Sequence, residues 1–340
     1  MNSTNNVTGC ATGHAIETGA SEPVAVIKGL NKTFAGKVAL NDINFTIRPG
    51  QVLAILGANG AGKTTLINGL LGRLSLDSGR IRIFGEKPGS LVVKRQTGAL
   101  LQVASLPDTL KVKEHIQLFQ SYYPKPMPYD EVIAYAGLEG LQERYSKKLS
   151  GGEKQRLLFA LSICGNPKLL FLDEPSVAMD VSARQSLWSA IRKLKQQGAA
   201  IVLTSHYLEE ADSLADEVLL LKEGKIIQHG TAEEIKASVS SSLIRFLNPD
   251  EDIDFYGFVD VVSVAQRGKY ISLQSRNTNK TLLSLLAAQP ELKELTVSQA
   301  GLEQAVLRME NTACQSNGIN GQALNEQRPA KQELSKRSAA

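Results

Sequence analysis

The spacing of apolar residues changes from segment to segment along the first part of the chain. Residues 43–47, INFTI, alternate between apolar and polar side chains, which predicts a strand with one buried face. The segment QVLAIL at 51–56 is a continuous apolar run after its first residue, as is typical of the middle of a parallel sheet. From Thr64 the spacing becomes helical, and it stops near Gly72. The pattern therefore predicts strand, loop and helix in succession.

Two further apolar runs predict buried strands in the second half of the chain. They are LLFLDEP at 169–175 and AAIVLTSH at 199–206. The segment between them predicts a helix with Ser182 as its N-cap and Gly198 just past its end. Its apolar residues share one face of that helix: Leu187, Ile191 and Leu194.

The remaining patterns complete an α/β fold. Residues 218–230, VLLLKEGKIIQHG, predict a hairpin with Glu223 and Gly224 at the turn. Residues 110–165 are mostly helical in pattern. Strands that alternate with helices favour a sheet with helices on both faces.

Composition divides the chain into four regions. Residues 1–21 are polar and weakly patterned, which predicts a disordered leader. Residues 22–238 hold the elements above and form the predicted main domain, with a helical subdomain at about 105–165. Residues 239–312 predict a small α+β domain. Residues 313–340 are polar and lack aromatic side chains, which predicts a disordered tail.

Within the small domain, one stretch is strand-like and two are helical in pattern. The strand-like stretch is 243–264, and the helices are TLLSLLAAQ at 281–289 and GLEQAVLRME at 301–310.

Composition and charge exclude several classes of protein. The chain has 340 residues and a formal net charge of +4, and its Lys and Arg residues form no dense block, so we expect no nucleic-acid partner. Cys10, Cys164 and Cys314 are far apart and form no CxxC, which argues against a disulfide framework or zinc site and fits a reducing cytosol. The N-terminus lacks a signal-peptide pattern, and no run reaches the ~18 apolar residues of a membrane span. Work at a membrane would require another chain to span it.

The segment GANGAGKT at 57–64 matches the P-loop pattern G-x-x-x-x-G-K-[ST]. Its glycines let backbone N–H groups approach a phosphate chain closely, and the next helix directs its positive end at the same place. Lys63 can place its ammonium on the β- and γ-phosphates, and Thr64 can offer a hydroxyl to Mg²⁺. ATP or GTP is the expected ligand.

A hydrolytic P-loop protein also needs an acidic group. Asp173 follows an apolar strand at the end where sheet ligands bind, and it can hold Mg²⁺ directly or through water. Glu174 comes next and can orient or deprotonate the attacking water.

A second anion site is predicted at LSGGEKQR, residues 149–156. Ser150, Gly151 and Gly152 stand just before an apolar helix, so free N–H groups, a hydroxyl and the helix dipole all favour a phosphate there. The two phosphate-binding devices of this chain need not face each other within one molecule.

With these motifs in order, the chain resembles the ATP-binding cassette (ABC) ATPases over about residues 24–235. LSGGEKQR resembles the signature of that family, and GANGAGKT and LLFLDEP resemble its Walker A and B motifs. The resemblance implies a P-loop NTPase (RecA-like) α/β core, an antiparallel β subdomain and a helical subdomain that carries the signature. It also implies that two cassettes meet head to tail, each ATP lying between one P-loop and the partner's signature.

The resemblance assigns roles to four more residues. Phe34 is similar to the aromatic that stacks on adenine, and Gln102 to the glutamine that contacts Mg²⁺ or water and signals to the membrane partner. Asp180 is similar to the aspartate that crosses the dimer interface, and His206 to the histidine at the γ-phosphate.

The expected site therefore has three overlapping sets of residues, with ATP and Mg²⁺ as cofactors. The catalytic set is Glu174, His206, Gln102 and Lys63. The Mg²⁺ set is Thr64, Gln102 and Asp173. The nucleotide-binding set is Phe34, Gly57, Asn59, Gly60, Gly62, Lys63, Thr64, Thr65, Ser150, Gly151, Gly152 and Asp180.

One residue and one short segment depart from the family pattern. Glu153 stands where glutamine is more usual, and residues 176–180, SVAMD, differ from the usual interface loop. Every catalytic position is filled, which argues against an inactive cassette.

The resemblance implies an ATP-hydrolysing transporter subunit at the cytoplasmic face of the inner (plasma) membrane. Its expected partners are a separate membrane-spanning permease subunit and a second copy of itself or a related cassette.

Residues 206–236 and the small α+β domain that follows look like the corresponding parts of the ATPases of ABC-2-type exporters, which favours export. An importer ATPase is the alternative. A soluble ABC protein is less favoured, because Lys63 and Asp173 are only 110 residues apart with no heptads between them, and no guanine-selecting motif supports a GTPase.

Overall fold

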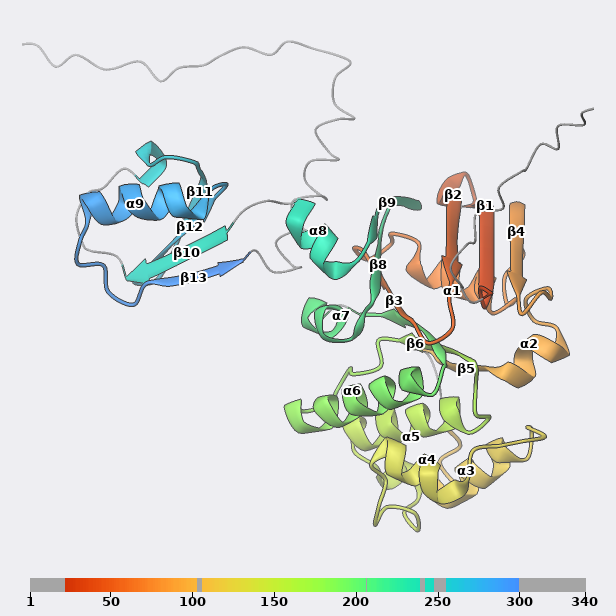
Figure 1. Cartoon of the computed structure of the whole chain (residues 1–340). Helices are drawn as coiled ribbons and strands as arrows, with labels where there is room; N and C mark the ends of the chain where they lie inside the picture. The colour runs from red at the N-terminus through yellow and green to blue at the C-terminus, as the bar shows by residue number, and fades with distance from the viewer. Residues whose placement is uncertain (1–21, 103–105, 206, 239–241, 248–254, 300–340) are drawn as a thin grey trace, which may run out of the picture.

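The computed structural model describes residues 22–102, 106–205, 207–238, 242–247 and 255–299. The predicted leader 1–21, the tail 313–340 and the predicted helix 301–310 lie outside the described residues. The described strands form three sheets, of which the largest has six strands in the order β5-β6-β7-β3-β8-β9 (Figure 1).

The six-stranded sheet forms the centre of the main domain. Its strands are β3 (Val52–Leu56), β5 (Thr97–Leu100), β6 (Leu169–Asp173), β7 (Ala200–Thr204), β8 (Glu217–Lys222) and β9 (Lys225–Gly230). All neighbours pair in parallel except β8 and β9. Every residue of β3, β6 and β7 is buried, which is why their sequences are apolar throughout. The predicted hairpin turn is confirmed, with φ of 48° at Glu223 and 76° at Gly224.

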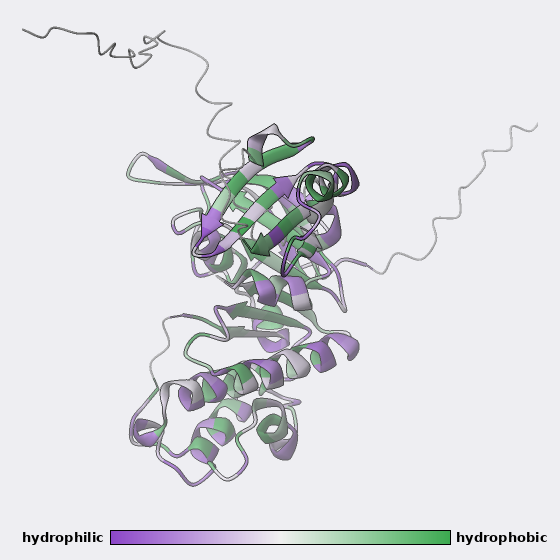
Figure 2. Cartoon of the chain, turned by 90° about the vertical axis from the view of Figure 1, so that its left-hand side faces the viewer, coloured by the Kyte–Doolittle hydropathy of each residue, from purple (hydrophilic) through white to green (hydrophobic). Residues whose placement is uncertain are grey.

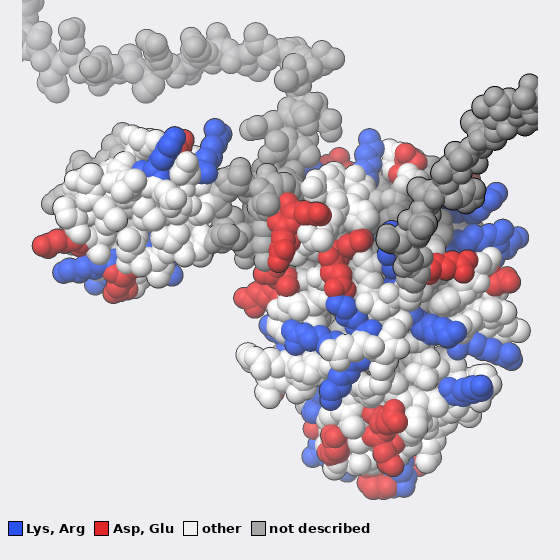
Figure 3. Space-filling view, viewed as in Figure 1, with Lys and Arg blue, Asp and Glu red and all other residues white. Residues whose placement is uncertain are grey.

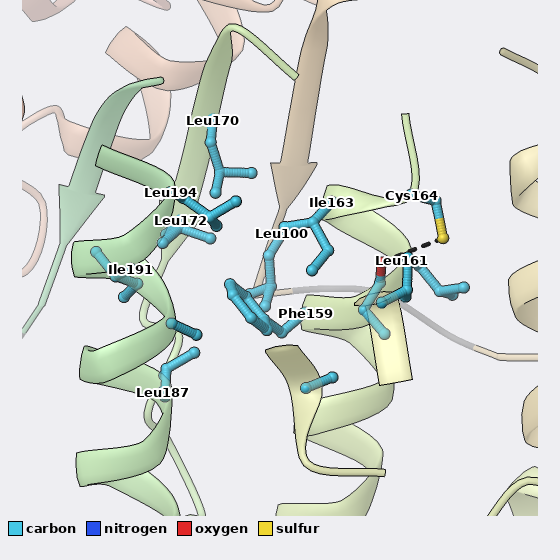
Figure 4. Packing of buried hydrophobic residues seen from close by; sticks show 14 of the residues in the cluster. Leu100, Phe159, Leu161, Ile163, Cys164, Leu170, Leu172, Leu187, Ile191 and Leu194 are labelled. Carbon is cyan, nitrogen blue, oxygen red and sulfur yellow. Dashed lines mark hydrogen bonds between the residues drawn. The ribbon is translucent and has the colours of Figure 1, made fainter. Parts of the chain in front are cut away.

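One face of this sheet is covered by helices. α5 (Gly151–Ile163) and α6 (Val181–Gln196) lie on the sheet, and α3 (Val112–Gln120) and α4 (Tyr129–Ala136) pack on α5. Figure 4 shows Leu170 and Leu172 of β6 beside Leu194 of α6, and Phe159 of α5 close by. The predicted apolar face of α6 is confirmed, because the three residues predicted to form it are buried: Leu187, Ile191 and Leu194.

The opposite face is covered by α1 (Lys63–Leu70) and a three-stranded antiparallel sheet. The strands of that sheet are β1 (Ala25–Phe34), β2 (Lys37–Ile47) and β4 (Ser78–Ile83), in the order β2-β1-β4. The predicted strand at 43–47 is the end of the longer β2. The main domain thus has an α/β core, an antiparallel β part and a helical part, as the resemblance to ABC ATPases implied.

The start of α6 corrects one prediction. Asp180, and not Ser182, is the N-cap: its carboxylate accepts a 2.8 Å hydrogen bond from the backbone N–H of Ala183. Both residue types favour N-caps, but the helix begins at Val181, so Ser182 lies inside its first turn. At the other end, Gln197 is the C-cap and Gly198 follows with φ of 93°, as predicted.

Three more helices and a second small unit complete the described chain. The helices are α2 (Leu91–Gln96), α7 (Leu208–Leu214) and α8 (Ala232–Ser238). The small unit consists of β10 (Ser242–Leu247), β11 (Val261–Arg267), β12 (Tyr270–Ser275), β13 (Thr296–Gln299) and α9 (Thr278–Ala288). Its antiparallel strands mix hydrophobic and hydrophilic residues (Figure 2), and a separate core containing Phe246, Leu273 and Leu285 holds it together.

No described helix combines the length and apolar content needed to cross a bilayer. On the face in Figure 3, Lys and Arg are interspersed with Asp and Glu. Cys164 is a buried free thiol, and burial raises its pKa to about 12.

Candidate functional site

The P-loop follows β3 and leads directly into α1, and packing enforces two of its glycines. Gly57 has φ of 149°, and a Cβ there would lie 2.1 Å from the carbonyl oxygen of Leu221. Gly62 has φ of 110°, and a Cβ there would lie 2.5 Å from the carbonyl oxygen of Ala39. Any side chain at either position would displace backbone of a neighbouring strand, so the loop keeps its shape only with glycine.

Lys63 closes this loop on itself. Its ammonium donates hydrogen bonds to the carbonyl oxygens of Gly57 at 2.6 Å and Ala58 at 3.2 Å, and the residue is buried. The positive charge is therefore held at the start of α1, where the helix dipole also favours an anion.

A cavity of about 560 Å³ opens over the loop. It brings together ten of the residues predicted from the sequence: Phe34, Asn59, Gly60, Gly62, Lys63, Thr64, Thr65, Gln102, Asp173 and Glu174. The cavity volume and the polar end near Lys63 suit a nucleotide whose phosphates lie on the loop.

Three lining residues were missed by the sequence analysis. Lys37, Val38 and Ala39 begin β2 and line the cavity beside Phe34, which is 45% exposed. The ammonium of Lys32 lies 5.1 Å from the centroid of the Phe34 ring. Phe34 at the end of β1 was the sequence signal for this side of the cavity. The tight turn between β1 and β2 then places the first residues of β2 at the same cavity, which the sequence pattern did not indicate.

The two acidic residues lie at the end of β6 and are both buried. The hydroxyl of Thr204 on β7 donates a 2.5 Å hydrogen bond to the carboxylate of Asp173. Glu174 has φ of 54°, and its backbone N–H donates to the Thr204 carbonyl oxygen at 3.1 Å. The amide of Gln155 on α5 donates to the Glu174 carbonyl oxygen at 3.2 Å, which connects this acidic end to the helix of the signature motif.

The signature residues form a capped helix start. Ser150 is the N-cap of α5: its hydroxyl accepts from the backbone N–H of Glu153 at 3.2 Å, and the Glu153 carboxylate accepts from the Ser150 N–H at 2.7 Å. A Cβ at Gly152 would lie 3.1 Å from the carbonyl oxygen of Ala178, so this helix start packs closely on the loop after β6. These two reciprocal hydrogen bonds form a capping box. It explains why glutamate can stand at position 153, since either Glu or Gln can accept from the N-cap N–H.

The structure does not bring all the predicted residues together. Ser150, Gly151, Gly152 and Asp180 are described, yet none of them lines the P-loop cavity. Asp180 is exposed and uses one carboxylate oxygen to cap α6. His206 lies outside the described residues.

The oxygen donors at the cavity fit the Mg²⁺ implied by the motifs. Thr64, Gln102 and Asp173 supply a hydroxyl, an amide oxygen and a buried carboxylate. The described residues hold no group of three or more His, Cys, Asp or Glu that could cage a metal. Mg²⁺ usually takes one or two carboxylates together with phosphate oxygens and water, so this sparse set suits it.

Comparisons with known proteins agree with this geometry. A sequence model for the ABC transporter domain matches residues 40–177. Nod factor export ATP-binding protein I of Rhizobium johnstonii is 34% identical over 220 residues, which are 62% of this chain and 71% of that protein. Daunorubicin/doxorubicin resistance ATP-binding protein DrrA of Streptomyces peucetius is 35% identical over 234 residues, which are 66% of this chain and 71% of that protein.

Solved structures show the same fold. The ATP-binding subunit of an ABC transporter aligns with a TM-score of 0.58 and 25% identity, covering 63% of this chain and 92% of that one. The structure of cbiO1 from Clostridium perfringens, part of the complex cbiONQ, aligns with a TM-score of 0.55 and 27% identity, covering 64% and 92%.

Proposed function

The chain belongs to the ABC transporter family as one of its ATP-binding proteins, and from this premise we propose that it powers export through a separate membrane-spanning subunit. As a member of that family it binds and hydrolyses ATP. The direction of transport rests on the similarity to a Nod factor export protein and a drug resistance protein.

The observation that carries the proposal is the separation of two phosphate-binding devices. The P-loop cavity is lined on one side by Lys63 and Thr64, and the signature start at Ser150 takes no part in it. Two copies placed head to tail, related by a twofold axis, bring each P-loop opposite a partner's Ser150. We propose this arrangement as the state that hydrolyses ATP.

Within that dimer, each group has a distinct task. Lys63 holds the β- and γ-phosphates, and Phe34 with its exposed ring stacks on the adenine. Thr64, Gln102 and Asp173 would hold Mg²⁺, which neutralises charge on the phosphates. Glu174 orients and deprotonates the attacking water, and His206 contacts the γ-phosphate by resemblance to the family. Asp180 reaches the dimer interface with the carboxylate oxygen that does not cap α6.

ATP binding closes the two cassettes and hydrolysis opens them. The γ-phosphate joins one P-loop to the partner's signature, so its release removes the tie between them. Gln102 lies on the loop after β5 and transmits the change to the membrane subunit, at the cytoplasmic face of the membrane. We further propose that residues 22–238 are the ATPase domain and 239–312 a separate domain, because the described part of the latter has its own core.

The experiment is to purify the complex that this chain forms in membranes and to measure ATPase activity and transport in inside-out vesicles. We expect a membrane-spanning subunit to copurify with the chain. We also expect ATP to drive accumulation of the transported compound inside the vesicles. In Glu174→Gln, hydrolysis falls by about 10²-fold or more, because the general base is lost, and ATP accumulates in a stable dimer seen by light scattering.

Glu209→Gln is the matched control, since Glu209 is an exposed acid on α7 outside the cavity. If Glu174→Gln hydrolyses ATP at the unmodified rate, the catalytic assignment is wrong. ATP-driven efflux from the inside-out vesicles would overturn the direction of transport.

A further inference from the structure

The start of α5 carries a negative charge, on Glu153, although its proposed role is to bind a phosphate. The Glu153 carboxylate lies in the first turn of the helix whose N-terminus receives the partner's γ-phosphate in the proposed dimer. One of its oxygens accepts from the backbone N–H of Ser150 at 2.7 Å. The same hydrogen bond that holds the N-cap in place therefore puts a negative charge beside an anion site.

Glu153 stays ionised at neutral pH. The Ser150 backbone N–H is the main cause that holds the Glu153 pKa below its usual value, and Arg144 and Arg156 lower it further. The Glu153 side chain is 18% exposed, so water screens its charge only in part. An uncompensated carboxylate here would repel a phosphate and weaken closure of the dimer.

Among the residues that the structure describes, one cation forms an ion pair with this carboxylate. The guanidinium of Arg144 donates to the other Glu153 oxygen at 3.1 Å. Arg156 is the second cation near Glu153, but its guanidinium donates to the Gly137 carbonyl oxygen at 2.6 Å. Arg144 is thus the residue that pairs with the oxygen left over from the capping box.

The backbone around Arg144 is fixed by the start of α3. The Arg144 carbonyl oxygen accepts from the Val112 N–H at 2.9 Å, and the Arg144 N–H donates to the Leu141 carbonyl oxygen at 2.9 Å. The next residue but one, Ser146, is buried and donates its hydroxyl to the Pro107 carbonyl oxygen at 2.6 Å. The guanidinium is therefore presented from a well-anchored segment.

We propose that Arg144 is a positioning residue of the signature motif, which neutralises Glu153 so that Ser150 and the α5 N-terminus accept the partner's γ-phosphate. This inference rests on the proposed head-to-tail dimer. In it, Glu153 orients Ser150 and Arg144 removes the electrostatic penalty of using a carboxylate for that purpose.

The test is a double-mutant cycle of Arg144→Met and Glu153→Gln in the full complex. Glutamine at 153 keeps an acceptor for the Ser150 N–H but removes the charge. We expect Arg144→Met alone to raise the KM for ATP about fivefold, the upper range for a partly exposed ion pair, with a smaller change in kcat. In the Glu153→Gln background, the same substitution should change KM by less than about twofold, because no charge remains to be neutralised.

Two further readouts separate this role from a structural one. The KM defect of Arg144→Met should shrink at higher salt, because salt weakens the repulsion between the partly exposed Glu153 carboxylate and the phosphate. Binding of a fluorescent ATP analogue to the dilute single chain should stay the same, because the effect acts only on closure. Lys113→Met is the matched control, since Lys113 lies on the same helical part and forms its ion pair with Glu143 instead of Glu153.

The outcomes are distinguishable. If Arg144→Met raises KM equally in both backgrounds, or has no effect in either, Arg144 does not act through the Glu153 charge and the inference is wrong. If Ser150→Ala leaves hydrolysis unchanged in the same assay, the head-to-tail dimer itself fails, and the proposed function fails with it.

Discussion

The P-loop end and the signature end of the molecule are built in different ways for the same kind of ligand. At the P-loop, residues from β1, β2, α1 and β6 surround one cavity, and Lys63 is bonded inside it. At the signature, a capped helix start packs on the loop at Ala178, and its residues line no part of that cavity. One end is an open pocket lined by several elements of one chain, and the other is a helix start at the surface.

Because of this difference, nucleotide binding and ATP hydrolysis should depend on different parts of the molecule. A pocket formed within one chain can bind a nucleotide by itself, whereas a surface contributes only when a second molecule covers it. Substitutions at the P-loop end should therefore change nucleotide binding by the isolated chain, whereas substitutions at the signature end should change ATP hydrolysis only in the assembled dimer.

The largest expected effect is on folding at the P-loop end. Gly57→Ala should lower the free energy of unfolding by about 3 kcal/mol or more, because overpacking and a left-handed φ both oppose the new Cβ. Gly60→Ala should cost only about 1 kcal/mol, since Gly60 has φ of 82° but nothing within 4 Å of the added atom. Urea unfolding of the two variants measures the difference, and equal losses would contradict the packing argument.

The next effect is on nucleotide binding. Lys63→Met should weaken binding of a fluorescent ATP analogue to the dilute chain by about 30-fold, near 2 kcal/mol, because a charge-assisted contact to phosphate is lost. Lys94→Met, which removes an exposed cation of α2, is the control and should bind normally. Normal binding by Lys63→Met would mean that the phosphates lie elsewhere.

The smallest effect on the ATPase cycle is at the signature end, and it appears in turnover and not in nucleotide binding. Ser150→Ala should lower kcat about tenfold in the complex while binding to the dilute chain stays unchanged, because the hydroxyl acts across the dimer. Loss of the N-cap also costs about 1 kcal/mol of stability. Ser90→Ala, which removes the N-cap of α2, should cost similar stability without lowering kcat. A binding defect in Ser150→Ala would place the signature in the chain's own pocket.

Local patterns predicted the elements whose residues share one environment. The central strands β3, β6 and β7 are buried on both faces, so their apolar runs identified them. The strands β4 and β5 were missed: β4 has four exposed residues among its six, and β5 has only four residues in all. Both depend on pairing with neighbours that are distant in sequence, which periodicity does not report.

The sequence by itself determined the chemistry of this protein, because backbone demands at the P-loop, the strand-end acids and the signature cap leave few acceptable residue types. Only the tertiary structure decided which of those groups share a cavity. It placed Lys37, Val38 and Ala39 beside Phe34, left Ser150 and Asp180 outside, and paired Arg144 with Glu153. Such neighbours are set by the packing of strands and helices that are distant in sequence. Short sequence patterns reflect only the local backbone conformation that a residue favours.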